Sequence, residues 1–450
     1  MKKSLAFIAA CSLLLACTPV IQPEQKDTAD PQEEEKPQDE KPQDETPPEE
    51  TPPEETPSEP LALSFSMDSP DPETAWSLGG TATAHITCPD AWTLSSSESW
   101  LQVEPASGPA GEFVVTLSTP ANPTAEDREA VVTLTSGTEG TSTTLVQHGN
   151  IFRSRVLRTR KVKSVHTLHC SSGINRLKYR VFLPYAETNQ YQTIRDVEYG
   201  EGVLETSPQG VKYLRFFKDY QPSKGDIKLE HTYTVDFQYL ETDFSKIARR
   251  DLPYDTESPA YKRYTSRCTA DAGFQMIDPL HPWVVSTANE LWAQADGDRI
   301  EFARLCYEKV ASAFRYEGFD GDNSVDEIID RMAGDCGNQH AIWLSLVRNK
   351  GIPARPVVMN SPDGFCHVRG EFCVAGYGWI PVDVTYHQGG GDYWGKFTDD
   401  HLVVMNRDFS FDTVPVDGEG YHINLLQVIH WFYWYWGSGE VTADYEFKYR

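Results

Sequence analysis

The chain has 450 residues and a formal net charge of −27, with 39% hydrophobic and 12% aromatic residues. This length predicts two or three domains, and the apolar content excludes a wholly disordered protein. The acidic excess disfavours binding to the phosphate backbone of nucleic acids, so we expect no nucleic-acid partner. Beyond the N-terminus no apolar run reaches 18 residues, which predicts that no helix spans a membrane.

The N-terminus has the pattern of a secretion signal. Two lysines precede an apolar run from Leu5 to Leu15, which is too short to span a bilayer as a helix. The following Leu-Leu-Ala-Cys motif, ending at Cys17, resembles a bacterial lipobox. The resemblance implies cleavage before Cys17 and lipid attachment to this residue; an ordinary secretory signal is the alternative. We therefore expect a signal peptide over residues 1–17 and a lipid anchor in the outer membrane. The cell surface is favoured, and the periplasmic face stays open.

Residues 18–60 form a low-complexity segment. It contains 15 acidic and three basic residues, and ten prolines fall between residues 23 and 60. Such a composition cannot bury a core, repels itself and favours extended chain. We expect a disordered linker that holds the following domain on the order of 100 Å from the bilayer.

Residues 61–149 predict a small all-β module. Short runs of alternating apolar residues recur at roughly ten-residue spacing and are separated by glycine turns, which is typical of a β-sandwich. The segments SSESWLQVEPASGPAGEFVVTLS, NPTAEDREAVVTLTS and LVQHG resemble a BACON module, an immunoglobulin-like sandwich. The resemblance leaves a glycan contact by this module open. For Trp100 we expect a place in the sandwich core rather than a sugar-stacking role.

The remaining chain predicts an α+β domain. Residues 150–275 form its β-rich N-terminal part, with strand-like runs from Val156 to about Phe237. Residues 276–450 hold the core, with helices predicted over Val284–Ala295 and Arg299–Phe314 and from Ser324 to a stop at Gly334. The run HWFYWYW from His430 and the alternating residues after Gly437 predict a C-terminal hairpin. Core packing of its aromatic rings is favoured, with substrate contact as the alternative.

One cysteine stands where a helix begins. In GDCGNQHAIWLSLVRNKGIPAR, Asp335 can cap a helix whose first residue is Cys336. The positive end of the helix dipole stabilises a thiolate over a thiol, which lowers the pKa and produces the reactive state. Cys336 is therefore our candidate nucleophile.

A histidine and an aspartate follow on a predicted hairpin. Phe365–Val374 and Trp379–Thr385 are strand-like runs around an Ala-Gly-Tyr-Gly turn. Pairing centred on residue 375 would place His367 roughly opposite Asp383, where side chains lie about 5 Å apart. Asp383 could then orient the imidazole of His367, which would accept the proton of Cys336.

These motifs resemble the transglutaminase-like superfamily. The matches are GDCG before a helix, Arg348 with GIPAR, His367 with Glu371 close behind, and GWIPVD ending at Asp383. The resemblance implies a papain-like α+β fold with flanking strands, behind the β-sandwich and the linker. By the same resemblance Cys336 is the nucleophile, His367 the base and acid, and Asp383 the orienting group. We expect Arg355 and Glu371 to be structural.

Three residues depart from the family pattern. Arg369 stands where many relatives have an aromatic residue, Asn338 where many have aspartate, and His340 where a small residue is common. His340 shares a helix face with Cys336, so it is a rival base, although a residue behind its own nucleophile is poorly aimed at substrate. The backbone N–H of Cys336 is the expected first donor of an oxyanion hole. The second donor is not identifiable, and the substrate-binding residues stay unknown.

The other cysteines show no metal or disulfide framework. Nine cysteines are present, and no C-x-x-C or paired-histidine motif appears among them, so we expect no metal and no cofactor. Apart from Cys11, Cys17 and Cys336, six remain, and they allow fifteen pairings that the sequence does not resolve.

The sequence thus predicts a surface-tethered cysteine acyl-transfer enzyme that acts on peptide or carboxamide bonds through a thioester. Hydrolysis is favoured because water is the abundant acceptor; transamidation, which would cross-link proteins, is an alternative. The expected partner is a protein, peptide or glycoprotein substrate, and the membrane is contacted through the lipid anchor only. A non-catalytic protein that binds glycan or glycoprotein is the alternative from another class.

Overall fold

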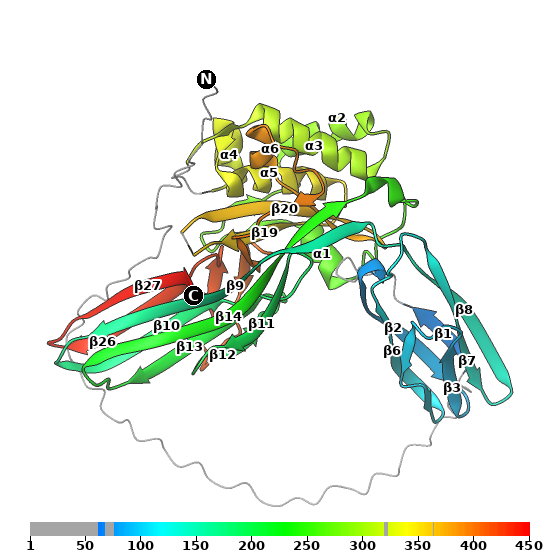
Figure 1. Ribbon diagram of the computed structural model, residues 1–450, viewed down its shortest axis with the longest axis horizontal. Coiled ribbons are helices and arrows are strands. Elements are labelled where there is room, and N and C mark those ends of the chain that lie inside the picture. The colour runs from blue at the N-terminus through cyan, green and yellow to red at the C-terminus, as the bar shows by residue number, and fades with distance from the viewer. Residues whose placement is uncertain (1–61, 68–75, 319–322, 363) are drawn as a thin grey trace, which may run out of the picture.

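The computed structural model describes residues 62–67, 76–318, 323–362 and 364–450. The predicted signal peptide, Cys17 and the linker lie outside these ranges. Within them no helix is long and apolar enough to cross a membrane. The described chain forms an N-terminal sandwich, a β-rich wing and an α+β core, which confirms the predicted fold class (Figure 1).

The N-terminal sandwich consists of two four-stranded sheets, ordered β1-β2-β6-β4 and β5-β3-β7-β8. Buried and exposed residues alternate along its long strands, as expected when one sheet face is covered. Trp92, 2% exposed, is a fully buried ring of this core. Trp100 packs at the core's margin instead, under the guanidinium of Arg128 at 4.3 Å. The strands are β1 (Ser64–Met67), β2 (Gly79–Cys88), β3 (Trp92–Ser96), β4 (Gln102–Glu104), β5 (Ser107–Gly108), β6 (Gly111–Pro120), β7 (Arg128–Ser136) and β8 (Glu139–Gln147), with η1 (Trp76–Leu78) before β2.

The wing consists of two sheets that face each other, a four-stranded sheet ordered β12-β13-β10-β26 and a five-stranded sheet ordered β11-β14-β9-β27, in which β22 also pairs with β14. β9 and β14 are 19 and 18 residues long, and their alternating apolar residues close a core between the sheets. The strands are β9 (Phe152–Cys170), β10 (Ile174–Pro184), β11 (Gln192–Glu198), β12 (Val203–Thr206), β13 (Lys212–Tyr220), β14 (Gly225–Thr242), β22 (Lys396–Phe397), β26 (His430–Gly437) and β27 (Val441–Tyr449).

The C-terminal strands do not form the expected hairpin. β26 pairs with β10, with Trp434 opposite Lys178, whereas β27 pairs with β9 in the other sheet, with Tyr445 opposite His166. Residues 438–440 therefore cross between two sheets. Alternating residues indicate that a segment is a strand but not which strand it pairs with. A hairpin and this crossover therefore have the same sequence pattern. Part of the aromatic run, including Trp431 and Tyr433, packs against the wing's core, in agreement with the favoured alternative.

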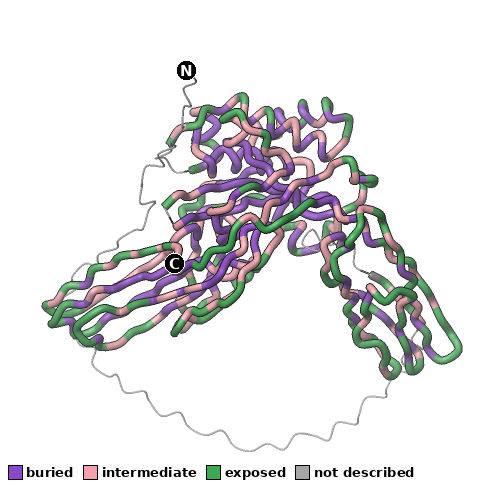
Figure 2. The backbone as a smooth tube through the Cα atoms, viewed as in Figure 1, coloured by how far each residue is buried: buried purple, intermediate pink, exposed green. Residues whose placement is uncertain are grey.

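The core packs helices on a four-stranded sheet ordered β21-β20-β19-β23. Helix α5 is buried on nearly every side, as its apolar residues all round the helix require. Figure 1 shows α2 to α6 on one side of β19 and β20 and the wing on the other, and Figure 2 shows buried residues concentrated at this junction. The principal elements are α1 (Pro259–Thr265), α2 (Pro282–Gln294), α3 (Arg299–Ala313), α4 (Val325–Arg331), α5 (Cys336–Asn349), α6 (Val384–Gln388), β19 (Ala354–Asn360), β20 (Cys366–Val374), β21 (Gly378–Val382) and β23 (Val403–Asn406). The short elements are η2 (Phe244–Lys246), β15 (Cys268–Thr269), β16 (Gln275–Ile277), β17 (Arg315–Tyr316), β18 (Ala333–Gly334), β24 (Ser410–Asp412) and β25 (His422–Asn424).

The predicted helix bounds hold to within one or two residues, with one exception. Helix α4 does not continue to Gly334, because Met332 adopts the left-handed conformation at its end, with φ of 46°. Ala333 and Gly334 then pair with β17 as a short parallel strand. A left-handed methionine is rarer than a left-handed glycine, which is why the sequence pointed to the wrong stop.

The sandwich contacts the core at the turn between β20 and β21. The Ser77 hydroxyl donates a hydrogen bond of 2.7 Å to the carbonyl oxygen of Tyr377. The ring of His148 stacks on that of Tyr377, with centroids 4.7 Å apart. The N-terminal sandwich therefore covers the tip of the hairpin that carries His367 and Asp383.

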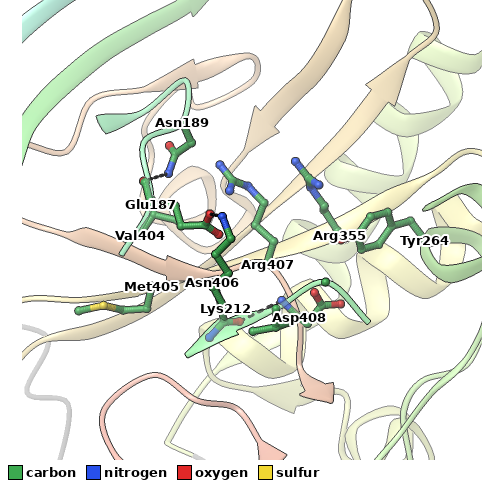
Figure 3. A pocket seen from close by; sticks show the side chains of 12 residues that line it. Glu187, Asn189, Lys212, Tyr264, Arg355, Val404, Met405, Asn406, Arg407 and Asp408 are labelled. Atoms are coloured by element: carbon green, nitrogen blue, oxygen red, sulfur yellow. Dashed lines mark hydrogen bonds and ion pairs between the residues drawn. The ribbon is translucent and has the colours of Figure 1, made fainter. Parts of the chain in front are cut away.

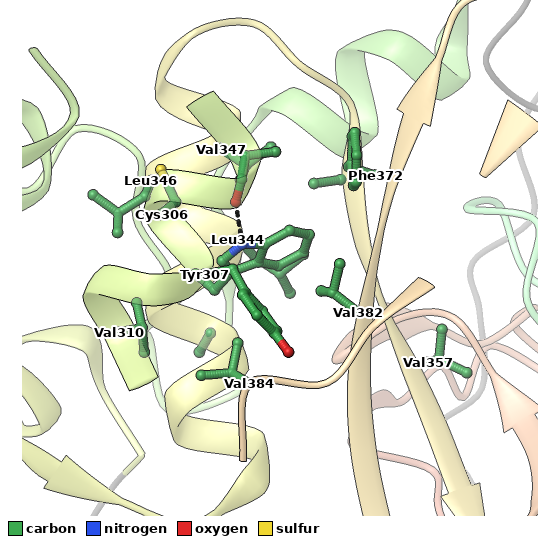
Figure 4. Close-up of a cluster of buried hydrophobic side chains, with 14 of the residues drawn as sticks. Cys306, Tyr307, Val310, Leu344, Leu346, Val347, Val357, Phe372, Val382 and Val384 are labelled. Carbon is green, nitrogen blue, oxygen red and sulfur yellow. Dashed lines mark hydrogen bonds between the residues drawn. The ribbon is translucent and has the colours of Figure 1, made fainter. Parts of the chain in front are cut away.

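Close packing of α5 on β20 depends on one glycine. Trp343 of α5 is fully buried and its indole N–H donates to the carbonyl oxygen of Ala303 at 3.2 Å. A Cβ at Gly370 would lie 2.5 Å from the Trp343 ring, so no larger residue fits without movement. The core around this contact includes Tyr307, Leu344 and Phe372 (Figure 4).

We predict that Gly370→Ala lowers the free energy of unfolding by about 1–3 kcal/mol, because the added methyl group overpacks the contact with Trp343. Urea denaturation followed by near-ultraviolet circular dichroism measures this change. Gly318→Ala is the control: it has nothing within 4 Å and no left-handed backbone, so its stability should stay near that of the wild type. Equal effects of the two substitutions would contradict the packing described here.

Candidate active site

Cys336 is the first residue of α5, as the sequence predicted. The Asp335 side chain accepts a hydrogen bond from the Asn338 backbone N–H, and the Asn338 side chain accepts one from the Asp335 N–H, both at 3.1 Å. Asn338 also donates its amide N–H to Asn323 at 2.8 Å. An aspartate at position 338 could not donate this bond, which gives a physical reason for the departure from the family pattern. Cys336 is 7% exposed at the positive end of the helix dipole.

His367 and Asp383 are brought together by the hairpin. The Nε2 atom of His367 lies 2.7 Å from Oδ2 of Asp383. The register differs from the expected one, because Gly370 pairs with Val382, which centres the hairpin on residue 376 and brings Arg369 opposite Asp383. His367 reaches Asp383 diagonally, since residues two apart on a strand share a face.

The carboxylate of Asp383 has polar partners on both oxygens. Oδ2 is shared by His367 and by Nε of Arg369 at 2.9 Å, and Oδ1 accepts from the Thr385 hydroxyl at 3.0 Å and the Tyr386 N–H at 2.9 Å. Burial would raise the pKa of Asp383, but His367 and Arg369 hold it well below its usual range. Asp383 therefore stays ionised and fixed in orientation.

Arg369 was missed as a site residue by the sequence reasoning. It is fully buried and forms ion pairs with Asp383 and, at 2.6 Å, with Asp399. The rings of Tyr386 and Phe397 lie 5.1 and 4.9 Å from its guanidinium carbon. Its position two residues after His367, on the same strand face, was the available signal. An arginine at this site compensates two buried carboxylates, which an aromatic residue could not do.

Two aromatic rings hold the imidazole of His367. Tyr386 stacks on it with centroids 4.5 Å apart and an interplanar angle of 14°, and Phe365 stacks at 5.9 Å and 21°. Burial, Asp399 and other neighbours, among them Cys336, raise the pKa of the Tyr386 phenol. Tyr386 is thus neutral and stacked on the ring of His367.

His340 lies between the backbone of Cys336 and the backbone of Val384, the residue after Asp383. Its Nδ1 lies 2.8 Å from the carbonyl oxygen of Cys336, and its Nε2 lies 3.1 Å from the backbone nitrogen of Val384. Both ring nitrogens are therefore occupied by backbone groups. This arrangement disfavours the alternative in which His340 acts as a rival base.

Arg355 and Glu371 form a structural ion pair, as expected. Nε of Arg355 lies 2.6 Å and Nε of Arg407 3.0 Å from the same Glu371 oxygen, and the Tyr191 hydroxyl donates to the other oxygen. Arg355 and Arg407 also line a polar cavity of about 260 Å³, with Lys212 and Asp408 in its wall (Figure 3). Glu371 is committed to these partners, so it is not a fourth catalytic group.

None of the seven cysteines in the described ranges forms a disulfide bond. Cys366, next to His367, is half-buried and its thiol donates to the side-chain oxygen of Asn360 at 3.6 Å. Within the same ranges no three His, Cys, Asp or Glu side chains cluster as metal ligands.

Two family models match the sequence. The model of the transglutaminase-like superfamily matches residues 285–384, and the BACON model, described as a candidate N-terminal binding domain, matches residues 90–148. The chain therefore contains a transglutaminase-like core domain preceded by a BACON domain, which confirms both resemblances. Among curated proteins no sequence matches the chain.

Several solved structures resemble parts of the chain. A candidate cysteine protease from Cytophaga hutchinsonii is 14% identical with a TM-score of 0.41, over 66% of this chain and 100% of that one. A candidate protease from Parabacteroides distasonis is 9% identical with a TM-score of 0.20, over 68% and 66%. A Bacteroides ovatus xyloglucanase bound to a heptasaccharide is 26% identical with a TM-score of 0.17, over 20% of each chain. Because these TM-scores lie below 0.5, the likenesses carry no conclusion about activity.

We predict that Arg369→Met lowers the free energy of unfolding by about 3–5 kcal/mol, because it leaves Asp383 and Asp399 without their shared cation. The loss should be smaller at pH 5 than at pH 8. Without the cation the folded-state pKa of the Asp383 carboxyl rises, and a group with a raised folded-state pKa favours the folded state as pH falls. Denaturant titrations at both pH values measure the difference.

Arg176→Met is the matched control, since Arg176 forms a two-bond ion pair with Asp219 at the protein surface. Its substitution should change stability little at either pH, because solvent screens an exposed pair. A similar loss in both variants would mean that burial of the Arg369 pair is unimportant.

Proposed function

We propose that this protein is a cysteine acyl-transfer enzyme with Cys336 as nucleophile, His367 as base and acid, and Asp383 as the orienting group. The observation that carries the proposal is the His367–Asp383 hydrogen bond of 2.7 Å on the hairpin that packs beside the helix begun by Cys336. A fixed imidazole near a thiol at a helix N-terminus is the arrangement that activates a nucleophile. The transglutaminase-like domain supports the same assignment.

The first half of the reaction forms a thioester. Because Asp383 is ionised and only accepts, the hydrogen of His367 lies on Nε2, and Nδ1 is left to take the proton of the Cys336 thiol. The thiolate attacks the carbonyl carbon of a peptide or carboxamide, and the backbone N–H of Cys336 stabilises the oxyanion. The carbon–nitrogen bond breaks as His367 returns the proton to the leaving amine.

The second half releases the acyl group. His367 takes a proton from water, the hydroxide attacks the thioester carbonyl, and the sulfur leaves as a thiolate that is reprotonated. The products are a carboxylic acid and the regenerated enzyme. An amine in place of water would give transamidation by the same steps, and we favour hydrolysis because water is the abundant acceptor.

The full chain would act from the outer membrane. The Leu-Leu-Ala-Cys motif at Cys17 and the acidic, proline-rich residues 18–60 support a lipid anchor followed by a spacer, with the enzyme at the cell surface. The BACON domain at residues 90–148 is a candidate contact for glycan on a glycoprotein substrate.

We predict that Cys336→Ala abolishes turnover of a peptide and glycopeptide library, read by mass spectrometry as cleavage, deamidation or cross-linking. Asp383→Asn should lower kcat by about 10²–10⁴-fold, since the imidazole loses its fixed tautomer. In the wild type the pH–rate profile with iodoacetamide should show one thiol that reacts well below the ordinary cysteine pKa of about 8.5.

Cys366→Ala is the matched control, because it removes a half-buried thiol beside His367 without touching Cys336. This variant should keep full activity and the reactive thiol. If Cys336 alkylates like an ordinary thiol and Cys336→Ala still retains glycan or glycoprotein ligands, the protein is a non-catalytic binder.

The anchor has its own test. Cells that express the full chain should incorporate labelled palmitate into the protein, and Cys17→Ala should lose the label and release the protein from the membrane fraction. Equal labelling of Cys17→Ala would exclude a lipid anchor at this residue.

A further inference from the structure

His340 sits between the two halves of the candidate active site. It is fully buried one helical turn after Cys336, and its two ring nitrogens contact the Cys336 carbonyl oxygen and the Val384 backbone nitrogen. A carbonyl oxygen only accepts and a backbone N–H only donates, so the contacts fix one tautomer. The hydrogen is on Nδ1, and Nε2 carries the lone pair.

This imidazole joins elements that the chain otherwise separates. One contact belongs to the turn of α5 that begins with Cys336, and the other to the residue directly after Asp383, where β21 passes into α6. The ring is also confined from the side, because its Cδ2 atom lies 3.3 Å from the place where a Cβ of residue 370 would stand. His340 is therefore a rigid spacer of fixed length between the cysteine turn and the aspartate turn.

The ring can serve as a spacer only while it is neutral. A protonated His340 would direct an N–H at the Val384 N–H and lose that bond. Burial lowers the pKa of His340 to about 4, although Asp383 and the bond to the Cys336 carbonyl oppose this shift. His340 thus stays neutral at ordinary pH and cannot accept the proton of Cys336.

We propose that His340 is a positioning residue that sets the separation between Cys336 and the His367–Asp383 pair. The inference rests on the proposed function, since it concerns the geometry of that reaction. Misplacement of a reacting group by 1 Å can cost about 10²-fold in rate, so a spacer of this kind governs kcat without contacting substrate. Its role is to act through the backbone of Cys336 and of Val384.

The test compares His340→Gln with His340→Leu. Glutamine offers one donor and one acceptor on a neutral planar group, so it can bond both Cys336 and Val384, whereas leucine fills similar space and bonds neither. We expect His340→Leu to lose about 10–100-fold in kcat with KM within about threefold. Its Cys336 pKa, read from the iodoacetamide profile, should rise toward that of a free thiol. His340→Gln should stay within a few-fold of the wild type in both readouts.

His231→Leu is the control for replacing a buried neutral histidine. His231 is 2% exposed in β14 of the wing, and burial lowers its pKa to about 4 as well. This variant should leave kcat and the pKa of Cys336 unchanged even if it lowers stability. The proposal would be overturned if His340→Leu had the kcat and the Cys336 pKa of the wild type. It would also be overturned if His340→Gln lost as much kcat as His340→Leu.

A measurement on the unmodified protein covers the case in which His340→Leu does not fold. Nitrogen-15 NMR of labelled histidines should show His340 as a neutral Nδ1–H tautomer between pH 5 and 8. An Nε2–H tautomer or a titration in this range would overturn the proposal. Failure of the proposed function would give a different result, namely full turnover by Cys336→Ala. That result would leave the tautomer of His340 undecided, so the two failures can be told apart.

Discussion

A carboxylate buried in the core constrains the whole site. Asp383 is fully buried, and an ion in such a place is tolerated only when charges and hydrogen bonds surround it. Arg369 and His367 provide the opposite charges or donors, and the first turn of α6 provides the remaining N–H and hydroxyl. The same contacts that make the ion tolerable also fix the tautomer of His367, so the stability of the core and the geometry of the candidate site have one origin.

The second constraint is the close packing of α5 on β20. Gly370 lets the Trp343 ring approach the strand, and this approach brings the start of α5 beside the hairpin that bears His367. Helix α5 is buried along most of its length, so its position is set by the core rather than by its own propensity. The thiol at the first residue of α5 is thereby placed by packing at Trp343, further along the same helix.

Local signals in the sequence predicted local features well. The capping pattern at Asp335 located the start of α5 to the residue, and the strand runs located the hairpin. The non-local facts were beyond reach. Pairing of β26 with β10 depends on a partner more than 200 residues away, and the ion pair of Arg369 with Asp399 depends on a loop brought in by the fold. The register error at His367 came from a turn centred one residue later than expected, which shifts every cross-strand pair by two.

The contact between the N-terminal sandwich and the hairpin turn makes the two domains interdependent. Ser77 and His148 cover Tyr377 at the point where the strands bearing His367 and Asp383 meet. A shortened chain that began at residue 150 would leave the Tyr377 carbonyl and ring facing water. Removing the first domain would therefore affect the site. It would loosen the turn of the β20–β21 hairpin, whose strands hold the imidazole of His367 and the carboxylate of Asp383 in register.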